Sequence, residues 1–259
     1  MISTVGMTLT FRNGLLTLLL LVMAVLAVGY GAALFLVFGE PEGALLIEAG
    51  PPLIVGLAGL IWLRRVYRKS NAPTVFFLAV FLFCVGADTL GALQAYFLVT
   101  NEPFAFGVAL TRTVWGFRIG GLVCLLLGSL FLLEFSYEKY GTLIAVAVLA
   151  SIVLVSGLPL QTTRPDSRGL YPLGDALGLT VLFALILALS TANYLLAWWN
   201  EEKAAATQQV NERKLPLMLG IWLLILAGWG LGLWLSPWWE LLMVPGAALL
   251  GGRNRGTLF

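Results

Sequence analysis

Long stretches of apolar side chains alternate with short polar connections along the whole chain. The long apolar stretches lie near residues 14–38, 44–66, 74–99, 106–135, 142–160, 174–199 and 216–235. Each holds about 19 residues or more, which as a helix can cross ~30 Å of hydrocarbon. A shorter stretch near 237–252 contains Pro245 and could be a short span, a re-entrant half-helix or an interfacial helix. The pattern predicts an all-α fold: a polytopic transmembrane helix bundle with seven long spans and a short eighth segment.

Composition supports this interpretation. Of the 259 residues, 60% are hydrophobic and 11% are charged, and the mean hydropathy is +0.95. A soluble domain usually carries about twice that charged fraction. No polar stretch is long enough to fold separately, so we expect residues 1–259 to form a single integral-membrane domain. The first apolar run is about 24 residues long and lacks a clear cleavage site, so we interpret it as a retained span.

Positive charges predict the orientation, because cytoplasmic connections are enriched in Lys and Arg. With eight crossings and a cytoplasmic N-terminus, about eleven of the fifteen cations lie on the cytoplasmic side, including the "RRVYRK" cluster at 64–69. We therefore expect a multi-pass protein of the plasma membrane, or of the inner membrane if the source is prokaryotic, with both termini in the cytoplasm. Trp198-Trp199 and Trp238-Trp239 flank spans, which is typical of the membrane interface, although paired tryptophans could also form a ligand slot.

Several kinds of chemistry are excluded by the residues present. The chain has no histidine, which excludes histidine-ligated haem and zinc and histidine acid–base catalysis. The four lysines all lie in polar connections, which excludes a Schiff base within a helix. Cys84 and Cys124 lie inside apolar runs without metal-ligand spacing, and we expect them to be reduced. We expect no metal, no cofactor and no nucleic-acid partner.

Three charged residues in consecutive spans lie at nearly the same predicted depth. Counted from the cytoplasmic end of each helix at about 1.5 Å per residue, Glu48 lies ~24 Å up, Asp88 ~21 Å and Arg118 ~25 Å. An isolated charge in hydrocarbon costs ~3 kcal/mol on insertion scales. We therefore expect Arg118 to face the bundle interior and to pair with Asp88, with Glu48 as a second acceptor. Arg112 lies ~9 Å further outward, near headgroup depth.

The neighbouring residues fit a packed polar cluster. Small residues surround Asp88 in "GADTLGALQAYF", which lets helices approach closely, and Gln94 adds a polar group nearer the outer mouth. Pro51-Pro52 follow Glu48 and would free backbone carbonyls and loosen the second span, as in transporter binding sites. Three interpretations stay open for Arg118: snorkelling to the outer headgroups, a structural ion pair, or a functional site.

Three classes of function follow from these observations. The first is a non-catalytic subunit, or a sensor or binding module, of a membrane assembly. The second is a small-solute transporter or channel that uses Glu48, Asp88 and Arg118 as an outward-facing site. The third, an intramembrane enzyme with a carboxylate acid–base pair, ranks last because the chain has no metal–diphosphate motif and no nucleophile elbow. Expected partners besides the bilayer are a membrane protein, a second copy of the chain, or a small solute or lipid.

Overall fold

The computed structural model describes ten segments of the chain and four single residues, and the secondary-structure elements named below are all helices. The segments are 2–36, 46–47, 49–91, 104–133, 159–161, 171–172, 177–204, 219–220, 222–224 and 237–252, and the single residues are 150, 153, 155 and 157. Glu48 and Gln94 lie outside them, as do most of the predicted spans near 142–160 and 216–235. The all-α prediction is confirmed.

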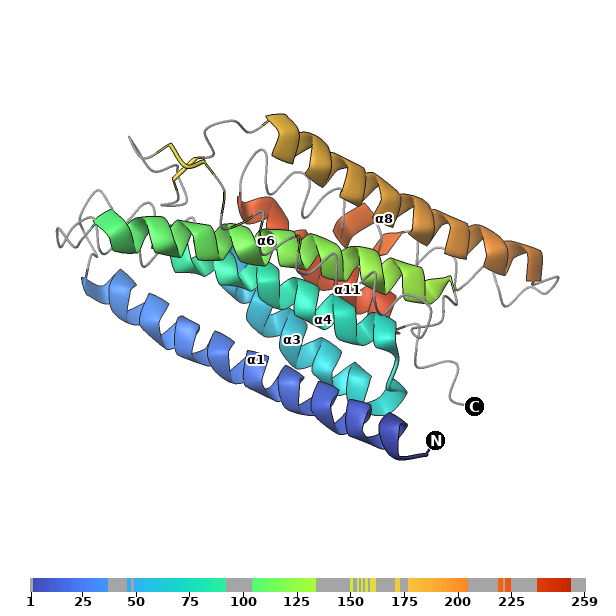
Figure 1. Ribbon diagram of the computed structural model, residues 1–259. Helices are drawn as coiled ribbons and strands as arrows, with labels where there is room; N and C mark the ends of the chain where they lie inside the picture. The colour runs from blue at the N-terminus through green and yellow to red at the C-terminus, as the bar shows by residue number, and fades with distance from the viewer. Residues whose placement is uncertain are drawn as a thin grey trace.

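Helix α4 (Pro73–Gly86) is the centre of the molecule. It lies between α3 (Gly50–Ser70) and α6 (Phe104–Leu132), as Figure 1 shows. Its sequence, PTVFFLAVFLFCVG, is apolar on every side after the first turn, and ten of its residues are buried. A helix that is hydrophobic all round is stable only where neighbours or lipid cover every face.

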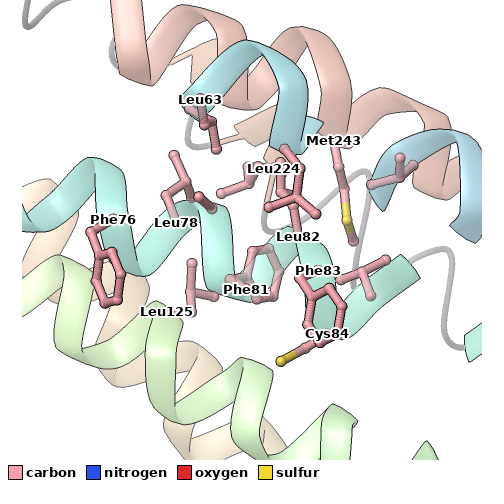
Figure 2. Packing of buried hydrophobic residues seen from close by; sticks show 14 of the residues in the cluster. Leu63, Phe76, Leu78, Phe81, Leu82, Phe83, Cys84, Leu125, Leu224 and Met243 are labelled. Atoms are coloured by element: carbon pink, nitrogen blue, oxygen red, sulfur yellow. The ribbon is translucent and has the colours of Figure 1, made fainter. Parts of the chain in front are cut away.

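The other elements are arranged around this central layer (Figure 1). Helix α1 (Ile2–Leu36) lies along α3 and α4, and α8 (Leu177–Ala204) packs on α6. The 3₁₀ helix η4 (Pro237–Leu242) and helix α11 (Met243–Gly252) both pack against α3. Side chains from these elements meet in one core, in which Leu224 and Met243 join the residues of α3 and α4 (Figure 2).

Short connections explain how α3 and α4 become antiparallel neighbours. Asn71 follows α3 in the left-handed conformation, with φ 50°, and its N–H donates to the carbonyl of Tyr67. Asn is one of the few residues that adopts this conformation at low cost, so it ends the helix. Pro73 then occupies the first turn of α4, where its missing N–H would have had no partner.

Helices α4 and α6 pack through aromatic rings and one small residue. Phe83 meets Phe117 edge-on with ring centroids 5.6 Å apart, and Phe77 stacks on Phe131 at 5.4 Å. Gly121 of α6 lies against Cys84 of α4, since a Cβ built on Gly121 would be 3.0 Å from the Cβ of Cys84. The aromatic rings and the close contact at Gly121 therefore determine how α4 packs on α6.

Two of the described helices are long and apolar enough to cross a membrane. They span Phe11–Leu36 and Phe106–Phe131, and the apolar helices Pro73–Thr89 and Val181–Ala197 are shorter. The described residues therefore do not establish the seven long spans expected from the sequence. Helix α3 carries four cations near its end, which reduces its apolar length, and of the predicted span 74–99 the structure describes only the part up to Gly91.

The prolines play a different part from the one expected. Pro51 and Pro52 lie in the first turn of α3, where a missing N–H costs no hydrogen bond, so the expectation that they loosen a span is wrong. Pro245 likewise lies in the first turn of α11, directly after the 3₁₀ helix, and it does not interrupt the helix.

Candidate functional site

Asp88 lies on a break in the helical geometry of the central helix. After Gly86 the backbone tightens into the 3₁₀ turn η1 (Ala87–Thr89), and all three residues of this turn are buried. Asp88 itself is 5% exposed. A 3₁₀ turn alters the direction in which successive side chains point. The carboxylate therefore projects from a turn, and this turn contacts both α3 and α6.

Arg118 of α6 forms an ion pair with Asp88. Nη2 of Arg118 lies 2.7 Å from Oδ2 of Asp88, and Nε donates to Oδ1 at 3.1 Å and to Oδ2 at 2.9 Å. Arg118 is 4% exposed. The guanidinium thus contacts the carboxylate through two of its nitrogens. Such a charge-assisted, two-point contact also fixes the orientation of the two side chains relative to each other. The pairing predicted from the shared depth of these two residues is present in the structure.

An aromatic stack covers the guanidinium. The Cζ atom of Arg118 lies 4.6 Å from the ring centroid of Trp115, which is one turn earlier in α6. Trp115 in turn stacks on Phe183 of α8, with centroids 6.0 Å apart and planes at 25°. A cation over an indole ring gains more where water is excluded. The contacts from Asp88 through Arg118 and Trp115 to Phe183 therefore connect the central helix to α6 and α8.

Hydrogen bonds hold the chain around this ion pair. The hydroxyl of Thr89, next to Asp88, donates to the carbonyl of Ala49 at 3.4 Å, and the hydroxyl of Tyr30 in α1 donates to the carbonyl of Leu46 at 2.8 Å. On α6, the buried hydroxyl of Thr111 accepts a hydrogen bond from the backbone N–H of Tyr171 at 3.3 Å. The bonds of Thr89 and Thr111 are buried, and the bond of Tyr30 is partly buried.

Of the other predicted site residues, the structure describes only Arg112, and it is not part of the ion pair. Arg112 lies six residues before Arg118 on α6, and its side chain is exposed. Glu48 and Gln94 fall outside the described residues, so the second acceptor stays a prediction. Within the described part of the chain, no three Cys, Asp or Glu residues lie close enough together to hold a metal ion. Cys84 and Cys124 are both free thiols.

Sequence reasoning missed some polar contacts. Trp115 could have been found, because a residue three positions before Arg118 shares its helical face. The amide of Asn193 in α8 donates to the hydroxyl of Ser129 in α6 at 3.1 Å, an interhelical bond with no distinctive sequence signal. Glu240 in η4 is also buried, at 2% exposure.

Comparison of the chain with protein families, with curated proteins and with solved structures finds no match to any of them. A paired carboxylate and guanidinium whose polar atoms bind one another can lock helices together, and they can bind a ligand only if the pair opens.

Proposed function

We propose that the chain is a non-catalytic multi-pass membrane protein, a subunit or binding module of a membrane assembly, in which the Asp88–Arg118 pair is structural. The observation that carries this proposal is the enclosure of the pair. Asp88 and Arg118 are 5% and 4% exposed, and Trp115 covers a face of the guanidinium. A solute pathway would need water to reach these charges, since polar groups at a transport site line a cavity.

The exposed apolar faces of the outer helices support a place in the bilayer. Helix α1 presents Phe11, Val25 and Val28 at 70–74% exposure, and α8 presents Leu185 and Leu189 at 56% and 55%. Water-facing surfaces rarely carry apolar patches of this kind, whereas lipid-facing surfaces do. On this proposal the chain crosses the membrane eight times with both termini in the cytoplasm, as the distribution of its cations indicates.

The exposed tryptophans fit the same arrangement. Trp199 near the end of α8 is 51% exposed, and Trp238 and Trp239 in η4 are 51% and 44% exposed. An indole prefers headgroup depth, because its ring is apolar and its N–H is polar. Their exposure favours a belt at the membrane interface over a ligand slot.

One observation favours the transporter as a second candidate. The change from α to 3₁₀ geometry directly at Asp88 resembles the interrupted helices that carry binding sites in transporters. The two candidates differ in one measurable property, namely whether water reaches the residues around the pair.

Thiol accessibility tests this difference. In a Cys84→Ala/Cys124→Ala background, cysteine is placed at Thr89 or Thr111, which are 2% and 0% exposed, or at the exposed Thr113 as the matched control on α6. The proposal predicts that a membrane-impermeant thiol reagent labels the Thr113→Cys protein in cells and leaves the other two unlabelled until denaturation. Labelling of the Thr89→Cys protein as fast as the control would contradict the enclosure and favour transport.

The mass of the protein purified in detergent tests whether the chain belongs to an assembly. A module of a membrane assembly should be isolated in mild detergent at a protein mass above the 28.0 kDa of one chain, with the excess contributed by a second copy or by one defined partner. Light scattering combined with mass spectrometry measures this. A monomer that catalyses solute flux in vesicles would contradict the proposal.

A further inference from the structure

Five cations gather at one end of the helical bundle. They are contributed by the N-terminal third of α1 and the last two turns of α3, and they are Arg12, Arg64, Arg65, Arg68 and Lys69. Helices α1, α3 and α4, which meet at this end, contain no Asp or Glu. None of the five forms an ion pair with any residue that the structure describes. Like charges one helical turn apart repel one another, so this cluster favours an external anion.

Two of these guanidinium groups are held between helices. Nη2 of Arg64 in α3 donates to the hydroxyl of Thr17 in α1 at 2.9 Å, and that hydroxyl donates to the carbonyl of Asn13 at 2.8 Å. The Cζ atom of Arg12 lies 5.8 Å from the ring centroid of Phe76 in α4. The helices therefore position both cations through neutral partners, and no acidic side chain among the described residues balances either charge.

The exposed face of α3 changes from apolar to basic along its length. Its exposed residues are Ile54 and Ile61, at 51% and 41%, followed by Arg65, Arg68 and Lys69. The spacing of these positions places them on one side of the helix. Arg65 lies ~6 Å beyond Ile61 along the axis. An apolar stripe that ends in a group of cations matches a phospholipid, with its acyl chain on one part and its phosphate on the other.

We propose that this end of α3, together with Arg12 of α1, binds the phosphate headgroup of an anionic phospholipid whose acyl chain lies along Ile54 and Ile61. The inference rests on the proposed place of the chain in a bilayer, and it adds a specific ligand to it. Clusters of cations at the cytoplasmic membrane surface attract anionic lipids, and arginines held between helices can select a headgroup. A phosphate in solution offers the same charge without the acyl chain.

Native mass spectrometry of the full-length chain in detergent tests the proposal. Phosphatidylglycerol and phosphatidylcholine with the same acyl chains are titrated, and phosphatidylglycerol should bind roughly tenfold tighter. Arg65→Gln/Arg68→Gln should weaken phosphatidylglycerol binding by about tenfold, which removes the preference, and leave phosphatidylcholine binding unchanged. The matched control Arg112→Gln/Lys203→Gln removes the same charge elsewhere and should keep the affinity within about threefold.

Each of these binding measurements has an outcome that would overturn the inference. Equal loss of affinity in both double variants would mean that the net charge of the protein, and not this cluster, attracts the lipid. Displacement of phosphatidylglycerol by glycerol phosphate at equal concentration would identify a site for a soluble phosphate instead. Carbonate extraction separates this result from the proposed function: a protein that stays in the membrane but shows no lipid preference contradicts only the lipid site.

Discussion

Gly56 of α3 and Gly86 of α4 meet with no side chain between their backbones. A Cβ built on Gly56 would lie 2.8 Å from the Cα of Gly86 and 2.6 Å from the Cε of Met23 in α1. Small residues allow transmembrane helices to approach this closely. Because Asp88 follows Gly86 by two residues, this crossing also sets the position from which the carboxylate reaches Arg118.

We predict that Gly56→Ala destabilises the protein by about 1–3 kcal/mol, since the added methyl group must displace the backbone of α4. The methionine side chain can move away, but the Cα of Gly86 cannot, so adding Met23→Ala should not restore the wild-type stability, the more so because Met23 is itself fully buried. Thermal unfolding in detergent measures both effects. Gly120→Ala is the matched control within a helix, because a Cβ there meets nothing within 4 Å, and it should be neutral or stabilising. A Gly56→Ala protein as stable as the control would contradict the close crossing.

The two cysteines give a second prediction. Cys84 is buried and Cys124 is partly buried, and both are free. Alkylation in denaturant without reductant should therefore add two alkyl groups to the intact mass, whereas alkylation of the folded protein should be slow at Cys84 because the thiol is enclosed. A protein that takes up both groups only after reduction would contain a disulfide, contrary to the structure.

Topology gives a third prediction. Cysteines placed at Ser3 and Thr257 should both resist a membrane-impermeant thiol reagent in intact cells, because the proposed topology has a cytoplasmic N-terminus and eight crossings that return the tail to the same side. Permeabilised cells provide the positive control. Labelling at Thr257 alone would mean an odd number of crossings, and labelling at Ser3 would invert the proposed orientation.

The helices follow from the sequence because their apolar runs are long and leave few alternatives. The residues at which these helices begin and end are predicted less accurately than the helices themselves. The predicted span 44–66 corresponds to α3 (Gly50–Ser70), which begins at the Pro51-Pro52 pair, and the rule that proline favours a first turn would have placed this start. The 3₁₀ turn at Asp88 has no comparable signal, because the residues around it suit either type of helix.

The ion pair could be predicted because leaving either charge alone in an apolar interior is costly, and matched depths identified the partners. Periodicity alone does not show which face of α6 meets α8, so Trp115 and Phe183 were missed as the cover of the guanidinium. The number of crossings could not be settled by apolar length either. Helix α3 carries cations near its end, and the apolar part of α8 is short.

A double-mutant cycle at Asp88 and Arg118 tests the structural role of the pair most directly. Asp88→Asn and Arg118→Gln should each lower the free energy of unfolding in detergent by ~3–5 kcal/mol, because each change strands a buried charge. The double variant should recover part of this loss, since no unpaired charge remains. Arg112→Gln, on the exposed face of the same helix, is the control and should change stability by less than about 0.5 kcal/mol.

The deciding measurement is the coupling free energy of this cycle, obtained from the unfolding of the wild type, the two single variants and the double variant. A structural pair enclosed in the core predicts a double variant more stable than at least one single variant, which with losses of ~3–5 kcal/mol in each single variant requires a coupling of at least ~3 kcal/mol. Strict additivity of the two losses, or a loss at Arg112 as large as that at Arg118, would contradict the account.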